Sequence, residues 1–237
     1  HVLLLLPFEK KYFDEENIQS TFTGHPLLED KEKDKIDVSQ IIKNHKKIIS
    51  IFPGSRQSEI NVLLPILIDF VKMMNEKYKD IFFVFHPTSE HNKLIQARLI
   101  KEGFKNCGSI SDEKIKSQIL KSSIFAVSKS GTISLEICNS KVPSIIIYKM
   151  NSINFFIVKM LVKVKFANII NIATDEIIIP ELLQPNCNSK NIFNNVDRPL
   201  ENQSSLQKQI NRSQEIISKF KTDQSSEIAA SILSNSL

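Results

Sequence analysis

Short apolar runs alternate with stretches of helical periodicity along most of the 237-residue chain. The apolar runs have few polar positions in either register, which is typical of strands buried on both faces of a parallel sheet. Strands are predicted at 2–6, 20–23, 48–52, 81–85, 107–110, 124–127 and 144–148. Helices are predicted at 10–16, 59–78, 90–102, 112–121 and from 133 onward. This alternation predicts an α/β fold, a Rossmann-like parallel sheet with helices on both faces.

The pattern changes at both ends of this alternation. A run dense in both charges at 29–37 is predicted as a solvated linker, and the polar tail carries two weakly amphipathic helices, at 206–220 and 227–233. We therefore divide the chain into the end of an amino-terminal domain with its linker, a sheet domain, and a carboxyl-terminal helical tail. Their ranges are 1–37, 38–185 and 186–237.

The first apolar run follows His1 directly, with no initiator methionine and no basic stretch before it. A signal peptide would carry such a basic stretch, so this start does not match one. We interpret the run as an internal strand and expect the chain to be a fragment.

One stretch combines a strand, a tight turn and a helix start. The strand at 124–127 leads to the turn Ser130-Gly131-Thr132, and helical spacing resumes directly afterwards. Free N–H groups at a helix start bind anions, and glycine lets a phosphate approach the backbone. Glu136, about one turn further on, is placed to accept hydrogen bonds from a ribose. A plain capping turn would use the same residue types, so both interpretations stay open at this point.

A second loop of the same kind is Gly54-Ser55-Arg56, which follows the strand at 48–52. An arginine there can pair with a diphosphate through two parallel hydrogen bonds. The alternative is that Arg56 pairs with Glu59 on the surface. Ligands of parallel sheets bind in the loops beyond the carboxyl ends of the strands, so we expect Arg56 and Gly131 to border one cleft.

Composition narrows the classes of partner. The net charge of +5 and the pI near 9.0 favour anionic ligands or a membrane surface. Basic residues are not interleaved with aromatics in a stripe, so nucleic acid is not expected as a partner. The three cysteines, Cys107, Cys138 and Cys187, are far apart, and no spacing of histidines or cysteines predicts a metal. Neither G-x-S-x-G nor a Walker loop is present, which disfavours a serine hydrolase and a P-loop kinase.

The segment 154–166 is predicted as an apolar helix with lysines on one side. A basic amphipathic helix of this kind can lie in a membrane interface. An ordinary helix that covers a sheet has the same pattern, and both interpretations stay open. In the first interpretation, the residues expected to contact the membrane are Phe155, Phe156, Lys159, Met160, Leu161 and Lys163. A loop with Asn171 follows, and Glu181 is a candidate first-turn acid of a short helix started by Pro180.

Taken together, these segments resemble one family, lipid-A-disaccharide synthase, a two-domain glycosyltransferase of the GT-B type. The resemblance covers roughly residues 2–185, and it depends on the order and spacing of several short segments. The matching residues are Leu5-Leu6-Pro7-Phe8-Glu9, Phe22-Thr23-Gly24-His25-Pro26-Leu27, Pro53-Gly54-Ser55-Arg56 with Glu59 and Leu64-Pro65, Ser130-Gly131-Thr132 with Leu135-Glu136, Pro143 with Tyr148-Lys149, Leu161-Val162-Lys163, Asn171, and Pro180-Glu181-Leu182-Leu183-Gln184.

The resemblance implies transfer of diacylglucosamine from UDP-diacylglucosamine to diacylglucosamine 1-phosphate, which gives lipid A disaccharide phosphate and UDP. It implies no metal and no cofactor, and a cytoplasmic enzyme peripheral on the inner membrane; a homodimer stays open. Residues 38–185 would be the nucleotide-binding half. In that half, Gly54, Ser55, Arg56, Ser130, Gly131 and Thr132 would bind the diphosphate, Glu136 the ribose, and Asn171, Glu181 and Gln184 the donor sugar.

The sequence departs from the family pattern in two ways. Ile169-Ile170 stands where the family has Leu-Pro before Asn171, so this loop is expected to differ. The half that supplies the acceptor site and the general base is not in the chain, so the catalytic base is unknown and the chain alone is expected to bind UDP weakly without turnover. Two alternatives remain: another GT-B enzyme that uses UDP-N-acetylglucosamine, and a non-catalytic domain that binds a phosphate ligand.

Overall fold

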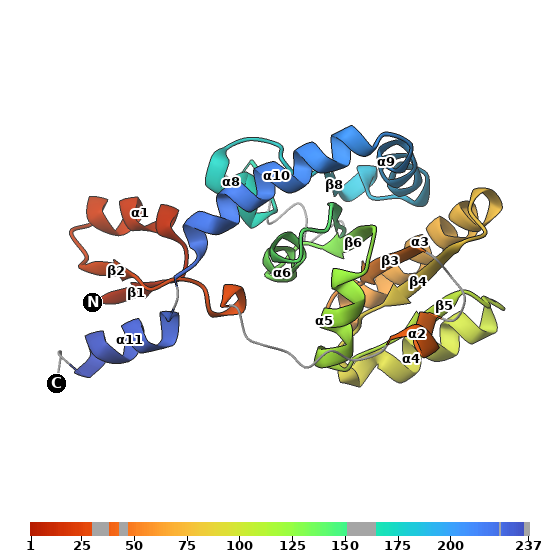
Figure 1. Cartoon of the computed structure of the whole chain (residues 1–237), viewed down its shortest axis with the longest axis horizontal. Helices are drawn as coiled ribbons and strands as arrows, with labels where there is room; N and C mark the ends of the chain where they lie inside the picture. Colours follow the sequence, from red (N-terminus) through yellow and green to blue (C-terminus); the bar gives the residue numbers. More distant parts are fainter. Residues whose placement is uncertain (30–37, 43–46, 151–164, 223, 235–237) are drawn as a thin grey trace.

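The computed structural model describes residues 1–29, 38–42, 47–150, 165–222 and 224–234. Its centre is a six-stranded sheet in the order β5-β4-β3-β6-β7-β8, and every neighbouring pair is parallel (Figure 1). The strands are β3 (Lys47–Phe52), β4 (Ile81–Phe85), β5 (Cys107–Ser109), β6 (Phe125–Lys129), β7 (Ser144–Tyr148) and β8 (Glu181–Leu183). The chain builds outward from β3 to β5 and then returns to the other side of β3. The strand order therefore reverses between β3 and β6, and this is the switch point at which such sheets bind ligands.

Helices connect the strands and extend beyond the sheet. Those of the sheet domain are α3 (Gln57–Lys77), α4 (Ser89–Lys101), α5 (Glu113–Lys121), α6 (Ile133–Asn139) and α8 (Ile169–Thr174). The carboxyl-terminal part begins with the 3-10 turn η3 (Gln184–Asn186) and continues with α9 (Ser189–Glu201), α10 (Gln203–Phe220) and α11 (Ser225–Ser234). Before the sheet lie β1 (Val2–Leu4), η1 (Pro7–Glu9), α1 (Lys10–Glu15), β2 (Ser20–Phe22), η2 (Pro26–Leu28) and α2 (Ser39–Ile42).

Alternate residues of the strands enter different cores, which explains why the strand sequences are apolar throughout. In β3, Ile49 and Ile51 pack with α3 and α9, whereas Ile48 packs with Ile119 of α5 on the opposite face. Ala126 of β6 lies with residues of α5 and α6 on that opposite face as well. Helices therefore cover both faces, and the predicted parallel α/β sheet is confirmed.

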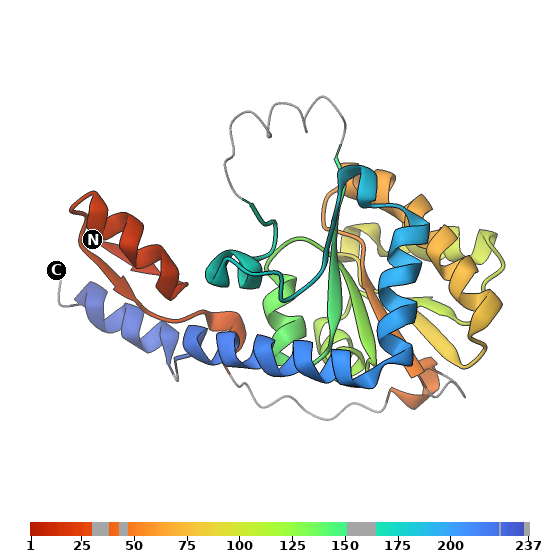
Figure 2. The same cartoon turned by 90° about the horizontal axis from the view of Figure 1, so that it is seen from above.

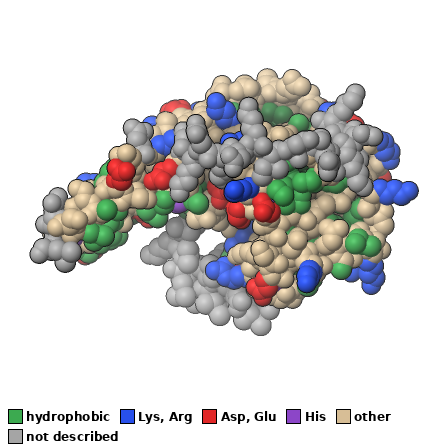
Figure 3. Space-filling view, turned by 60° about the horizontal axis from the view of Figure 1, so that its bottom comes forward, with side chains coloured by type: hydrophobic (Ala, Val, Ile, Leu, Met, Phe, Trp, Pro, Cys, Tyr) green, Lys and Arg blue, Asp and Glu red, His purple; other side chains and the backbone are tan. Residues whose placement is uncertain are grey.

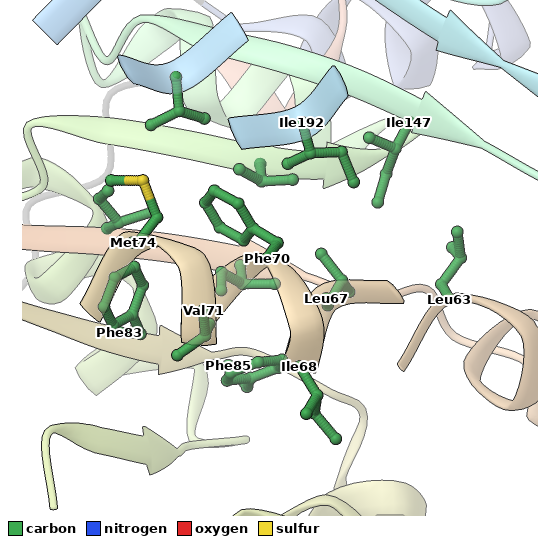
Figure 4. Packing of buried hydrophobic residues seen from close by; sticks show 14 of the residues in the cluster. Leu63, Leu67, Ile68, Phe70, Val71, Met74, Phe83, Phe85, Ile147 and Ile192 are labelled. Atoms are coloured by element: carbon green, nitrogen blue, oxygen red, sulfur yellow. The ribbon is translucent and has the colours of Figure 1, made fainter. Parts of the chain in front are cut away.

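Helix α3 supplies much of the larger core (Figure 4). Phe70 of α3 meets Phe83 of β4 edge to face, with ring centroids 6.2 Å apart. Ile192 of α9 packs on the same cluster. The other buried residues of α3 recur at helical spacing and are Ile60, Leu63, Leu64, Leu67, Ile68, Val71 and Met74. Pro65 lies inside the helix on its exposed side, away from this core.

Several element predictions are wrong. The sequence predicts no helix at Ser189–Glu201, where α9 packs on the core, and no strand at β8. Asn171 lies inside the short helix α8 and not in a loop. Glu181 opens β8 and does not start a helix after Pro180. The predicted helix at 154–166 lies almost entirely outside the described residues, and its described end is not helical.

A small unit lies apart from the main sheet. It contains the parallel pair β1–β2 with α1. Helix α10 leads from the sheet domain towards this unit, and α11 is a separate helix beyond the end of α10 (Figure 2). The connecting segments touch at Gly24, whose φ is +87° and whose Cβ would lie 2.0 Å from Thr222 Oγ1. Thr222 Oγ1 donates to the carbonyl of Thr23 at 2.6 Å, so only glycine fits at this crossing. The division into 1–37, 38–185 and 186–237 stays a prediction.

Candidate functional site

A pocket of about 330 Å³ opens at the switch point of the sheet. Three loops border it, and they follow β3, β4 and β6. Its lining residues are Phe52, Gly54, Ser55, Arg56, His86, Pro87, Thr88, Glu113, Lys116, Lys129, Ser130, Gly131, Thr132 and Ile133. The two loops singled out in the sequence, Gly54–Arg56 and Ser130–Thr132, therefore border one cleft, as the shared edge of parallel strands requires.

Glu59 organises the charges of this pocket. Its Oε1 lies 3.0 Å from Arg56 Nη1 and 2.9 Å from Lys129 Nζ, so one carboxylate pairs with a cation from each loop. Its Oε2 accepts hydrogen bonds from the backbone N–H groups of Ser55 and Arg56, at 3.0 and 3.3 Å. Burial tends to raise the pKa of Glu59, but the hydrogen bonds from Lys129, Ser55 and Arg56 hold it below its ordinary value. The expected surface pair between Arg56 and Glu59 thus exists, and Arg56 borders the pocket at the same time.

Gly54 makes this arrangement possible. Its φ is +107°, and a Cβ at this position would lie 2.6 Å from Glu59 Oε2. A side chain here would therefore push the carboxylate away from the loop. Gly131, in the other loop, has no neighbouring atom within 4 Å of its Cβ position, so the backbone there is open to a ligand.

Glu136 lies beside the pocket and not in its lining. Its Oε2 is 3.4 Å from Lys116 Nζ, and Lys116, which is only 12% exposed, lines the pocket and also pairs with Glu113. Glu136 itself borders a second pocket, together with Pro26 and residues of α5 and α6. Lys116 thus connects the predicted ribose-binding carboxylate to the pocket.

The turn after β6 is tied to a more distant segment. Ser130 Oγ donates to the carbonyl of Ala167 at 2.5 Å. The carboxylate of Glu181 accepts from the N–H groups of Ala167 and Asn168, at 2.8 and 3.0 Å. Hydrogen bonds thus link Ser130, through the backbone of Ala167, to Glu181 of β8.

Asn171 is fully buried and its amide is fully engaged. Nδ2 donates to the carbonyl of Ile179 and to Glu181 Oε1, both at 2.8 Å. Oδ1 accepts from the N–H groups of Ile178 and Ile179, at 2.9 and 3.0 Å. In this structure Asn171 and Glu181 support the backbone at 167–168 and 178–179.

Gln184 differs from these two residues. It follows β8 with a φ of +53°, which is uncommon for a residue with a side chain. It is 7% exposed, and its Nε2 has no hydrogen-bond partner among the described residues. Strained backbone and an unpaired buried donor are both features that cluster at ligand sites.

His86 forms part of the pocket wall, although no role is predicted for it from the sequence. Its ring stacks on Phe52 with centroids 4.8 Å apart, and its Nε2 lies 3.1 Å from Ser50 Oγ. Burial, and then the charge of Lys116, lowers the pKa of His86 to about 3, so the ring is neutral at ordinary pH. Lys129 lines the pocket as well, although no role is predicted for it. Its place between the strand predicted at 124–127 and the turn Ser130–Thr132 is a usable signal.

The residues expected to contact a membrane, from Phe155 to Lys163, lie outside the described part of the chain. No helix among the described residues is both long and apolar enough to cross a bilayer. On the face shown in Figure 3, basic and acidic side chains lie next to one another and do not form one basic field.

Comparison with known proteins gives a consistent picture. A family model described as lipid-A-disaccharide synthetase matches residues 1–234. The lipid-A-disaccharide synthase of Rickettsia typhi is 36% identical over 238 residues, which cover 97% of this chain and 61% of that protein. The corresponding protein of Sulfurihydrogenibium sp. is 32% identical over 215 residues, which cover 81% and 54% of the two chains. The chain thus spans about three fifths of the length of the first of these relatives and less of the second.

Solved structures share the fold at low sequence identity. The UDP-GlcNAc 2-epimerase of Neisseria meningitidis, bound to UDP-GlcNAc, has a TM-score of 0.67 at 15% identity and covers 98% of this chain and 61% of its own. A putative UDP-N-acetylglucosamine 2-epimerase of Listeria monocytogenes has a TM-score of 0.64 at 13% identity, with 98% and 59% covered. These likenesses support the fold alone. With a family model matched over nearly its whole length, the chain belongs to the lipid-A-disaccharide synthetase family.

Proposed function

We propose that this chain is the nucleotide-binding part of a glycosyltransferase of lipid A biosynthesis. The reaction is transfer of diacylglucosamine from UDP-diacylglucosamine to diacylglucosamine 1-phosphate, with release of UDP. Membership of the family supports the reaction class, and the UDP-sugar bound by the N. meningitidis epimerase supports a UDP-sugar as ligand of this fold.

The observation that carries the proposal is the pocket at the β3/β6 switch point, with Arg56, Lys116 and Lys129 in its wall. A diphosphate needs cationic donors and an approachable backbone, and the open backbone at Gly131 meets the second need. Arg56, Lys129 and the turn Ser130–Thr132 would therefore hold the diphosphate. Glu136, held by Lys116, would accept the ribose hydroxyls.

The donor sugar would lie towards β8. Gln184 is the best candidate for direct contact, because its buried Nε2 lacks a partner among the described residues. Glu181 would act on this side by holding the N–H groups of Ala167 and Asn168, and Asn171 would act by holding Glu181. Ser130 is tied to the carbonyl of the same Ala167. Direct contact of Asn171 with the sugar would require its four present hydrogen bonds to change.

Because the proposed substrates carry acyl chains, the enzyme would act at a membrane surface. We therefore propose a peripheral position on the cytoplasmic side of the inner membrane, with the segment 154–166 as a candidate contact. A homodimer is a further assembly to be tested, by light scattering at several protein concentrations.

The proposal is tested by calorimetric titration of the chain with UDP, uridine, UDP-N-acetylglucosamine and UDP-diacylglucosamine. We expect UDP to bind, and Arg56→Ala to weaken UDP by about ten- to a hundredfold with little change for uridine, since a charge-assisted pair to a phosphate contributes about 1.5–3 kcal/mol. Equal weakening of both ligands would contradict a diphosphate contact by Arg56.

The donor series separates the alternatives. Stronger binding of the acylated donor supports lipid A synthesis, and preference for UDP-N-acetylglucosamine supports a different sugar-nucleotide enzyme. We expect the chain alone not to transfer sugar, and transfer above the blank would contradict this. Reading the coding sequence upstream of residue 1 separates an enzyme with an acceptor domain from a non-catalytic phosphate-binding domain.

A further inference from the structure

We propose that Glu59 is a positioning residue that holds Arg56 until a diphosphate enters, releases the arginine to this diphosphate, and keeps Lys129. This inference rests on the proposed function, because it names a step in the binding of the same diphosphate. It assigns to one carboxylate the positions of two of the pocket cations, Arg56 and Lys129.

The two ion pairs of Glu59 differ in their exposure to solvent. The Arg56 side chain is 73% exposed, whereas those of Lys129 and Glu59 are 16% and 14% exposed. Exposed ion pairs are weak because water competes for both charges. Lys129 has a second contact, with its Nζ 5.3 Å from the centre of the Tyr148 ring. Arg56 is therefore the partner that can leave.

The carboxylate itself is fixed independently of Arg56's guanidinium. The N–H groups of Ser55 and Arg56 hold Oε2, and the absence of a Cβ at Gly54 leaves room for it. When the guanidinium turns to a diphosphate, which accepts two parallel hydrogen bonds, Glu59 stays paired with Lys129. The pocket then loses one internal ion pair and gains one to the ligand.

This exchange makes Glu59 a competitor of the ligand. Arg56 is either paired with Glu59 or free to meet the ligand. A ligand that needs the free arginine binds more weakly in proportion to the fraction of molecules in which Arg56 is paired. As UDP leaves, Arg56 pairs with Glu59 again. Glu59 should therefore lower the affinity for UDP and speed its release.

The direct test is Glu59→Gln, which keeps the size of the side chain and an oxygen for the backbone N–H groups but removes the charge. We expect UDP to bind about two- to fivefold more tightly, the range for an exposed ion pair, with a slower dissociation in stopped flow and unchanged affinity for uridine. The matched control is Glu76→Gln, an exposed glutamate near the other end of α3, which should leave both affinities unchanged. Unchanged or weaker UDP binding in a folded Glu59→Gln protein overturns the inference.

A double-mutant cycle locates the effect. In an Arg56→Ala background, Glu59→Gln should no longer tighten UDP, because no guanidinium remains to be released. Tightening that persists there would show a general effect of charge on the pocket and would overturn the exchange.

If Glu59→Gln does not fold, the exchange can still be tested on the unmodified chain by NMR. The Arg56 Nε–H resonance, assigned by its loss in Arg56→Lys, should shift on addition of UDP or of inorganic pyrophosphate and stay in place with uridine. A shift with pyrophosphate but not UDP would support the exchange and count against the nucleotide. No shift with either ligand overturns the inference.

Discussion

Lys129 Nζ lies 2.9 Å from Glu59 Oε1, so the last residue of β6 pairs with the first turn of α3 across the point where the strand order reverses. This contact joins the two loops that border the pocket. It also means that the loops cannot move apart without separating two charges that are mostly withdrawn from water. The pocket is thus held together by its own charges before any ligand enters.

Gly54→Ala should damage both stability and binding. Its φ of +107° disfavours a side chain, and the new Cβ would meet Glu59 Oε2 at 2.6 Å. We expect the free energy of unfolding to fall by about 2–3 kcal/mol in urea titrations. The UDP affinity should fall as well, because the strained backbone would shift the Gly54–Arg56 loop that lines the pocket. Gly103→Ala is the matched control, because its φ of +75° is also positive but no atom lies within 4 Å of its Cβ position. It should cost about 1 kcal/mol and leave UDP binding intact; equal losses in both variants would rule out the clash.

Acidification should destabilise the chain through His86. The pKa of its ring is about 3 in the folded state and 6.5 ordinarily, so below pH 6.5 the unfolded chain binds a proton that the folded chain does not. Stability is therefore full above pH 6.5 and falls as the pH drops towards 3. In His86→Gln the fall in urea midpoint between pH 6.5 and 5 should be shallower. Some slope should remain, because burial also lowers the pKa of His25. An unchanged slope would contradict a buried neutral ring.

Asn171→Ala should be among the most destabilising single changes. It removes an amide with four hydrogen bonds and leaves the N–H groups of Ile178 and Ile179 without partners. The expected loss is about 2–4 kcal/mol of unfolding free energy, measured in urea. Asn195→Ala in α9 is the control, since among the described residues its amide donates only to the carbonyl of Asn191, one turn earlier. A loss under about 0.5 kcal/mol is expected. Comparable losses in the two variants would show that the Asn171 bonds are replaceable.

Asp197 adds polar contacts to the apolar packing between α9 and the carboxyl end of α3. Tyr78 Oη donates to its Oδ1 at 2.6 Å, and Lys77 pairs with the same carboxylate. Asp197→Ala should lower the unfolding free energy by about 1 kcal/mol. The UDP affinity should not change, because Asp197, Tyr78 and Lys77 do not line the pocket at the switch point. Glu201→Gln should have no measurable effect, since its pair with Lys77 is exposed. A weakened UDP affinity in Asp197→Ala would show that α9 influences the pocket.

The main sheet could be predicted because its principal strands are apolar in both registers and separate clear helices. The convergence of Gly54–Arg56 with Ser130–Thr132 followed from topology, since both loops leave the same edge. The strand β8 was missed because it is only three residues long and begins with Glu181. The helix α9 was missed because polar residues and an internal proline dilute its apolar stripe.

Side-chain partners could not be predicted in the same way. Lys129 and Glu59 are distant in sequence, and no periodicity shows which cation a carboxylate selects. The sequence around Asn171 does not indicate that its amide bonds to the backbone of Ile178 and Ile179. Such contacts depend on tertiary distances of a few ångströms, whereas sequence patterns report only which face of an element is apolar.

The contact of Gly24 with Thr222 has a consequence for changes made after α10. Thr222 donates to the carbonyl of Thr23, which is 199 positions earlier in the sequence, and Ser225 adds a hydrogen bond to Glu29. A deletion that begins after Phe220 would remove both of these contacts. Its first effect is therefore expected at the β1–β2 pair, far from the edited position.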